Sequence, residues 1–198
     1  MAGDATDELA RRLVHVSGAV FPLSYLLGVM SWRELGWVLV AVATAAFCLE
    51  ALRLYVGLDW AILQRLFDRL TRAYEQDNLA GYFLYLFSMA LVALLFDPRS
   101  ALPGILMLAI ADPVSGLLGS GELRAAKQGL VLLVTFGVSL LIALSFVSLV
   151  PAVLGALAAT LADGVKPAPW GYVLDDNLTI PIAAALAIEA GLRLPVGV

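Results

Sequence analysis

The residues that could do chemistry begin with Asp112, a carboxylate inside a long apolar stretch. On insertion scales a carboxylate at the centre of a membrane helix costs about 2.5–3.5 kcal/mol, so it needs a partner or a role. On a helix, Ser115, Gly116 and Gly119 lie on the same face as this carboxylate. Pro113 cannot donate to the carbonyl one turn before Asp112, which leaves a second oxygen nearby. Two such oxygens suit a divalent cation. The alternative is a proline kink with a small-residue packing face.

A second polar group, Asp175-Asp176-Asn177-Leu178-Thr179-Ile180-Pro181, opens the last apolar run. Acidic and amide residues followed by an early proline are typical of a helix N-terminus. Free backbone amides at such a terminus also attract phosphate. Capping alone would explain part of the group. As metal or nucleotide ligands, Asp176 and Asn177 would complement Asp112.

The stretch Ser120–Gln128 between these groups offers Gly121, Arg124 and Lys127. Glycine lets backbone amides approach a polyphosphate closely, and the two cations would neutralise its charge. An ordinary basic loop on the cytoplasmic side of a membrane would look the same. The sequence leaves both interpretations open.

Composition places these residues in a membrane protein. The 198 residues are 62% hydrophobic and 14% charged, with a mean hydropathy of +0.94. Soluble domains carry about 45–50% apolar and about 25% charged residues. The single cysteine, Cys48, and the single histidine, His15, exclude thiolate and multi-histidine metal sites. A net charge of −4 argues against a nucleic-acid partner.

The elements that must position these residues are helices, since strand patterns, internal repeats and low-complexity segments are lacking. We expect an all-α polytopic membrane bundle forming one integral membrane domain, 1–198, of about seven transmembrane helices plus one interfacial helix. The interfacial helix is predicted at Asp59–Asp77, where apolar and charged residues alternate at helical spacing. The spans are predicted near 12–28, 34–55, 80–96, 101–119, 129–147, 150–163 and 178–193.

The positive-inside rule then predicts a multi-pass protein with a cytoplasmic N-terminus, because nine of the 12 Lys and Arg residues fall on that side. Asp112, the loop after it and the Asp176 group all come to the same membrane face. The length of one stretch allows two topologies. The uncharged stretch 128–162 barely accommodates two spans with a turn at Pro151, and a single crossing would place everything after Asp163 outside.

Smaller signals accompany these groups. Glu50 and Arg53, and likewise Arg72 and Glu75, are one helical turn apart and predict local ion pairs. His15, one turn after Arg12, is a packed or capping histidine more often than a catalytic base. Glu189 lies in the last span, far from the inner face, and receives no role.

Several stretches resemble the polyprenol kinase family of dolichol, phytol and farnesol kinases, with the closest likeness to the short archaeal dolichol kinases. Lipid cytidylyltransferases are relatives of this family. The matching stretches cover most of the chain, and the last is the most specific: Glu8–His15 (ELARRLVH), Glu50–Arg53 (EALR), Arg72–Gly81, Asp112–Gly119 and Asp176–Pro181 (DNLTIP).

The resemblance implies transfer of the γ-phosphate of CTP to an isoprenoid alcohol in a magnesium-dependent reaction. Asp112 resembles the aspartate of the family's glycine-aspartate motif, although Ala111 stands where many members have glycine. Lys127 resembles the lysine of its nucleotide motif, which is shorter here and lacks a glutamate. Asp176 and Asn177 resemble its final Asp-Asn pair.

The sequence therefore predicts a membrane kinase that uses Mg²⁺ and CTP and takes its alcohol from the bilayer. Asp112 and Asp176 would hold the metal or the attacking hydroxyl, and Lys127 would face the phosphates. Further cofactor contacts are expected from Ser115, Gly116, Gly119, Arg124, Asn177 and Thr179. Supporting roles are expected from Arg12, His15, Glu50, Arg53, Arg72, Glu75 and Asp175.

Two other classes remain open from the sequence. A lipid cytidylyltransferase would use the same acids but attack the α-phosphate. A small membrane carrier or assembly factor would bury carboxylates without catalysis. Assembly into a homo-oligomer is also left open.

Overall fold

The structure is a computed structural model that describes residues 12–56, 71, 75–76, 78–118, 129–165 and 174–195. Every regular element within these ranges is a helix, which confirms the all-α prediction. After a helical turn at 12–17 the elements are α2 (Val20–Leu26), α3 (Trp32–Ala51), η1 (Leu52–Val56), α5 (Gly81–Leu95), α6 (Pro98–Leu106), η3 (Met107–Ala111), α7 (Asp112–Leu118), α8 (Gly129–Leu144), α9 (Leu149–Gly164) and α10 (Asp176–Leu192).

Two continuous helical segments are long and apolar enough to cross a membrane, Trp32–Tyr55 and Pro98–Leu118. The helices Gly81–Leu95, Gly129–Leu144 and Leu149–Gly164 are apolar but shorter. The helical regions fall where the seven spans are predicted, whereas the number that cross a bilayer stays a prediction. The predicted interfacial helix at Asp59–Asp77 lies mostly outside the described residues, as do Gly119, Arg124 and Lys127.

Within the uncharged stretch 128–162, α8 and α9 pack against each other as a helical hairpin. The turn lies at 145–148, so its predicted position at Pro151 is wrong. Pro151 instead occupies the first turn of α9. Proline is tolerated there because the first N–H groups of a helix have no partner within it.

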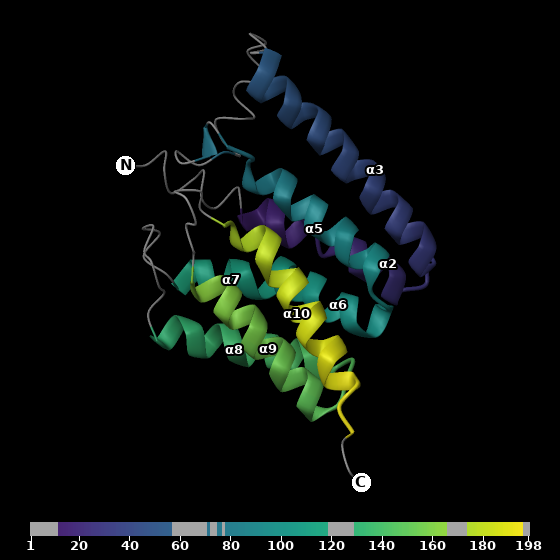
Figure 1. Cartoon of the computed structure of the whole chain (residues 1–198), viewed down its shortest axis with the longest axis vertical. Coiled ribbons are helices and arrows are strands. Elements are labelled where there is room, and N and C mark those ends of the chain that lie inside the picture. The colour runs from purple at the N-terminus through teal and green to yellow at the C-terminus, as the bar shows by residue number, and fades with distance from the viewer. Residues whose placement is uncertain are drawn as a thin grey trace.

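Helix α10 lies at the centre of the bundle, packed against α9, α6 and α5 (Figure 1). Small residues allow this packing. A Cβ at Gly104 of α6 would lie 2.7 Å from the backbone oxygen of Pro181, and a Cβ at Gly155 of α9 would overlap the side chain of Ile188. The close approach holds α10, which carries Asp176, against the helices that carry the other candidate residues.

The break predicted around Pro113 takes the form of a widened turn. The residues Met107–Ala111 form the π-helical segment η3, and the α-helix resumes at Asp112. Such turns within α-helices occur frequently at functional sites. Proline contributes because it removes the N–H that an α-helical turn would require.

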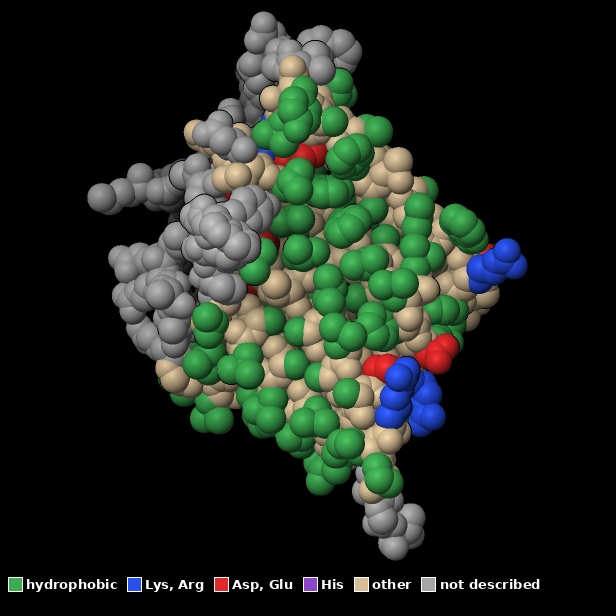
Figure 2. Space-filling model, viewed as in Figure 1, with side chains coloured by type: hydrophobic (Ala, Val, Ile, Leu, Met, Phe, Trp, Pro, Cys, Tyr) green, Lys and Arg blue, Asp and Glu red, His purple; other side chains and the backbone are tan. Residues whose placement is uncertain are grey.

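The surface of the bundle is unusually apolar. Leu27, Leu133 and Leu141 are 76%, 66% and 70% exposed, and many other large hydrophobic side chains are also exposed. Figure 2 shows hydrophobic side chains spread across the middle of one face, with charged side chains gathered at its edges. Exposed patches of this extent indicate a membrane or partner surface, and together with the two long helices they support membrane association.

Candidate metal centre

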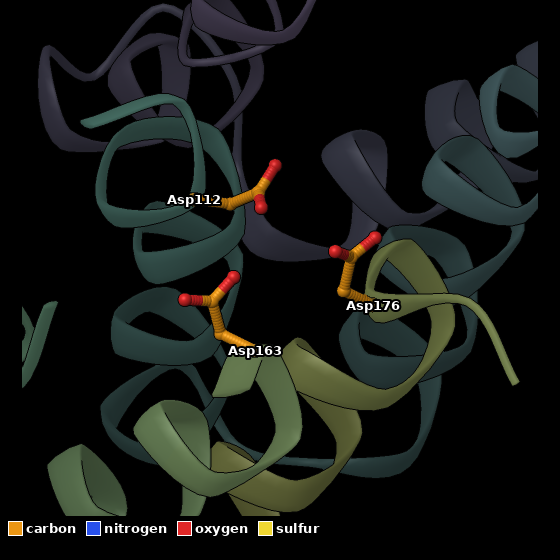
Figure 3. A group of neighbouring side chains, drawn as sticks. All are labelled: Asp112, Asp163 and Asp176. Atoms are coloured by element: carbon orange, nitrogen blue, oxygen red, sulfur yellow. The ribbon is translucent and has the colours of Figure 1, made fainter. Parts of the chain in front are cut away.

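Three carboxylates from three helices meet at one end of the bundle. Asp112 begins α7, Asp163 lies next to the end of α9, and Asp176 begins α10. One oxygen from each lies within 4.8 Å of the others. In Figure 3 all three side chains point toward a common space between their helices. The structure thus brings together the two aspartates predicted from sequence, Asp112 and Asp176, and adds Asp163.

The packing of α9 against α10 explains how two of these residues meet. Helices α9 and α10 pack antiparallel, with Gly155 against Ile188 and Pro151 against Gly191, so the last turn of α9 lies beside the first turn of α10. Asp163 is 1% exposed and Asp176 is 3% exposed. Asp112 retains 13% of its side-chain exposure. Burying like charges this close together is costly unless opposite charge compensates them.

Sequence reasoning misses Asp163. It ends an apolar run on the membrane face predicted to carry Asp176, a position where a charged residue is ordinary. One hydroxyl orients its carboxylate, since Ser115 Oγ donates to Oδ1 at 3.1 Å. Thr135 Oγ1 lies 3.4 Å from Oδ2, but its closer acceptor is the backbone oxygen of Val131 at 2.9 Å. Ser115 is fully buried, so the structure places this expected cofactor contact against Asp163.

A second polar group surrounds Gly81 at the start of α5. Asp175 caps α10, since its Oδ1 accepts from Asn177 N at 3.0 Å and from Asn177 Nδ2 at 2.6 Å. A Cβ at Gly81 would lie 2.8 Å from Asn177 Nδ2 and 3.4 Å from Glu75 Oε1. Glycine is therefore needed where these side chains meet. The predicted N-terminal cap of the last helix is confirmed.

The side-chain oxygen of Asn177 is buried without a described hydrogen-bond donor. The residue is 1% exposed, and its Oδ1 accepts no hydrogen bond from any residue that the structure describes. Buried polar atoms nearly always have a partner, so such an atom needs an explanation. A bound ligand at this end of the bundle would supply one. Thr179, also expected as a cofactor contact, donates to the backbone oxygen of Asp175 at 3.3 Å.

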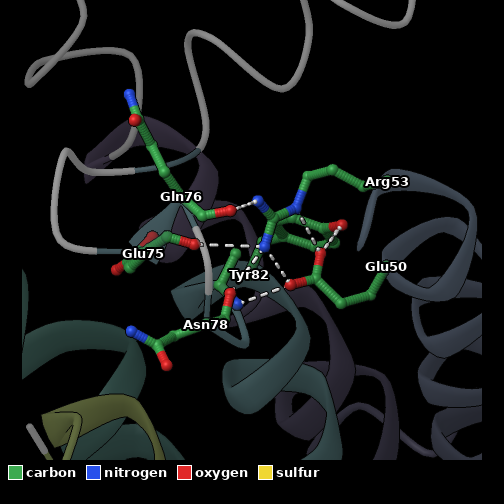
Figure 4. A network of polar contacts seen from close by, with 7 residues as sticks. Glu50, Arg53, Glu75, Gln76, Asn78 and Tyr82 are labelled. Carbon is green, nitrogen blue, oxygen red and sulfur yellow. Dashed lines mark hydrogen bonds and ion pairs between the residues drawn. The ribbon is translucent and has the colours of Figure 1, made fainter. Parts of the chain in front are cut away.

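The predicted Glu50–Arg53 pair is confirmed and is part of a larger network (Figure 4). Arg53 Nη2 lies 2.6 Å from Glu50 Oε1, and the guanidinium also donates to the backbone oxygens of Glu75, Gln76 and Asn78. Glu50 accepts from Ala80 N and from the Tyr82 hydroxyl. The network fixes the chain entering α5, and with it Glu75. The partner predicted for Glu75, Arg72, lies outside the described residues.

The expected supporting residues of the N-terminus also reach this end of the bundle. His15 Nδ1 lies 3.3 Å from Asp112 Oδ2, the distance of an ion pair. The Arg12 guanidinium lies against Gly116. A Cβ added at Gly116 would lie 3.3 Å from Cζ of Arg12. Gly116, predicted as a cofactor contact, is thus the residue over which Arg12 packs.

Glu189, which received no role from sequence, lies near the other end of α10. It accepts a hydrogen bond from Ser100 Oγ at 2.7 Å and pairs with Arg193 at 3.0 Å. It therefore ties α10 to α6. A cavity of about 550 Å³ lies there, lined by residues that include Trp32, Arg33, Glu189 and Arg193. This cavity is separate from the three aspartates.

The donor set at the aspartates fits a hard divalent cation. Asp112, Asp163 and Asp176 (hereafter the acidic triad) offer only oxygen atoms, which Mg²⁺ and Ca²⁺ prefer. Asn177, the residue after Asp176, has a further buried oxygen, Oδ1, without a described partner. A cation would also offset the repulsion among three close carboxylates.

Comparison of the chain with protein-family models, with curated protein sequences and with solved structures finds no significant match. The geometry of the acidic triad and the sequence motifs are therefore the observations that bear on function.

Proposed function

We propose that this protein is an integral membrane kinase that transfers the γ-phosphate of CTP to a long-chain isoprenoid alcohol. The observation that carries the proposal is the acidic triad, whose oxygens lie within 4.8 Å of one another at one end of an apolar bundle. The likeness of its Asp112–Gly119 and Asp176–Pro181 stretches to polyprenol kinases supplies the reaction class.

Asp112, Asp163 and Asp176 would hold Mg²⁺, with Asn177 adjoining. Phosphoryl transfer depends on positioning and charge neutralisation more than on covalent catalysis by the protein. Mg²⁺ bound there would neutralise the phosphate oxygens and orient the transferred group. Ser115 holds the Asp163 carboxylate in place, since its hydroxyl donates to it.

The reaction balances as a single displacement. The alcohol oxygen forms a bond to the γ-phosphorus, the bond from that phosphorus to the bridging oxygen breaks, and CDP leaves. A carboxylate of the triad accepts the hydroxyl proton. Arg124 and Lys127 face the phosphates in this proposal, and both follow α7, the helix that Asp112 begins.

The bilayer position follows from the charge distribution in the sequence. We place the acidic triad at the cytoplasmic face, with seven spans and the N-terminus inside. The alcohol then reaches the triad from the bilayer with its hydroxyl at the interface, and the nucleotide reaches it from the cytoplasm. The exposed apolar side chains of the bundle support the proposal that the chain is embedded in a lipid bilayer.

The test uses purified protein in lipid nanodiscs with Mg²⁺, mixed polyprenols and CTP labelled on either the α- or the γ-phosphate. We expect lipid product labelled only from the γ-position, and a loss of at least about 100-fold in the variant Asp112→Asn, since a metal-bridging carboxylate is removed. Asp97→Asn, at the other end of the bundle, is the matched control and should retain activity.

Other outcomes identify the rival classes. Label transferred from the α-position with release of pyrophosphate indicates a cytidylyltransferase. The absence of any labelled lipid across a panel of prenols and nucleotides, in protein that binds no Mn²⁺, contradicts an enzyme and favours a carrier or assembly factor.

A further inference from the structure

The helical turn at 12–17 lies against α7, the helix that Asp112 of the acidic triad begins. Arg12 and His15 are three residues apart and therefore lie on the same side of this turn. Arg12 packs over Gly116 of α7, and His15 approaches Asp112 at the start of the same helix. The turn thus brings basic side chains to an end of the bundle where carboxylates gather.

The contact with Asp112 involves one carboxylate oxygen. His15 Nδ1 lies 3.3 Å from Oδ2, and the two side chains are 15% and 13% exposed. A histidine with a proton on Nδ1 attracts the carboxylate whether the ring is neutral or charged. Because the two oxygens of a carboxylate are rigidly linked, an interaction at Oδ2 also restricts the direction of Oδ1.

His15 is itself fixed by a buried tyrosine of α5. The hydroxyl of Tyr85 donates to the backbone oxygen of His15 at 2.7 Å, and the two rings lie 4.6 Å apart between centroids. Tyr85 is only 4% exposed. A Cβ at Gly18 would overlap this hydroxyl, so the glycine makes room for it. The backbone and the ring of His15 are therefore both held by one rigid side chain.

We propose that His15 is a positioning residue that orients the Asp112 carboxylate for a small divalent cation, with Tyr85 and Gly18 holding the histidine in place. The inference rests on the proposed cation site and adds the selectivity of that site. Mg²⁺ requires near-ideal octahedral geometry, whereas Ca²⁺ accepts flexible and irregular ligand arrangements. A carboxylate released from His15 therefore loses more Mg²⁺ affinity than Ca²⁺ affinity.

The test measures cation binding in the purified full-length protein without substrate. Electron paramagnetic resonance follows the binding of Mn²⁺, and competition gives the affinities for Mg²⁺ and Ca²⁺. We expect His15→Ala to weaken Mg²⁺ binding about 10–100-fold, the effect typical of residues that orient metal ligands, and to weaken Ca²⁺ binding less. His15→Asn, whose amide can donate from near the position of Nδ1, should recover part of the Mg²⁺ affinity.

Val16→Ala is the matched control, since Val16 is the next residue and is exposed. It should bind both cations as the wild type does. Thermal unfolding in detergent verifies that each variant is folded, and His15→Asn carries the test if His15→Ala does not fold. Tyr85→Phe removes the hydroxyl that holds His15 and should shift selectivity toward Ca²⁺ in the same direction.

The outcomes separate this inference from the proposed function. If Asp112→Asn abolishes Mn²⁺ binding while His15→Ala leaves the ratio of Mg²⁺ to Ca²⁺ affinity unchanged, the inference is wrong and the cation site stands. The inference is equally wrong if His15→Asn binds Mg²⁺ no better than His15→Ala. If Asp112→Asn binds Mn²⁺ as the wild type does, the cation site itself is wrong.

Discussion

At the scale of single residues, the acidic triad depends on a buried hydroxyl as well as on its three carboxylates. Ser115 is fully buried and donates to Asp163 at 3.1 Å, although the sequence suggested that it would face a ligand directly. Its role is thus to hold a neighbouring acid. Hydrogen bonds to a charged group contribute about 1.5–3 kcal/mol, more than those between neutral groups.

This arrangement predicts different results for two buried serines. Ser115→Ala removes a donor to Asp163 and should lower activity about 10-fold or more and stability by about 1–3 kcal/mol, because a buried charged acceptor loses a partner. Ser139→Ala is the control. Ser139 is equally buried, but its hydroxyl has no partner among the described residues, so this change should be neutral or stabilising. Equal effects in thermal unfolding and in kinase assays would contradict the role of Ser115.

Asp112 and Asp176 could be predicted from sequence, whereas Asp163 could not be distinguished from a span boundary. A carboxylate within an apolar run stands out because its burial is costly. Asp163 ends such a run, where a charged residue is ordinary. Its burial to 1% exposure depends on α10 packing beside it, and that contact is invisible in a single sequence. The approach of His15 to Asp112 likewise depends on tertiary packing.

At the scale of elements, the triad is held together by the fit between α6 and α10. The Cα of Gly104 faces the backbone of Pro181, which cannot move out of the way as a flexible side chain could. Asp176 lies one and a half turns before Pro181, and Asp112 follows α6 through η3. Separation of α6 from α10 would therefore also separate two carboxylates of the triad.

A pair of glycine substitutions tests this fit. Gly104→Ala should destabilise the protein by about 1–3 kcal/mol, as overpacking does, and should weaken Mn²⁺ binding. Gly137→Ala on α8 is the control, because a Cβ there meets nothing within 4 Å. It should stabilise the helix by about 0.5–1 kcal/mol. Unchanged Mn²⁺ affinity in a destabilised Gly104→Ala variant would show that the fit supports the fold but not the triad.

Helix positions could be predicted well from the apolar runs, and turn details less well. The hairpin of α8 and α9 is one of the two arrangements that the length of the 35 uncharged residues allows. The prediction of a turn at Pro151 is wrong because proline is also compatible with the first turn of a helix, where Pro151 lies. The widened turn η3 has no simple sequence signature beyond the nearby Pro113.

At the scale of the whole molecule, the charge distribution predicts an orientation. The turn between α5 and α6 at Phe96–Asp97 should lie outside the cell, and the segment before α5 should lie inside. With Cys48→Ser as background, Asp97→Cys should react with a membrane-impermeant maleimide on intact cells. Gln76→Cys, exposed at the other end, should react only after permeabilisation. The reverse pattern would contradict the proposed orientation and place the triad away from cytoplasmic CTP.

The account as a whole requires a cation at the acidic triad, and a crystal of the purified protein soaked in Mn²⁺ measures this directly. Anomalous diffraction should show a peak within about 2.0–2.6 Å of oxygens of Asp112, Asp163 and Asp176, the range of oxygen–metal distances for hard cations. The same crystals of Asp163→Asn should show a weaker peak or none. A well-ordered triad without a peak at saturating Mn²⁺ would contradict the central claim.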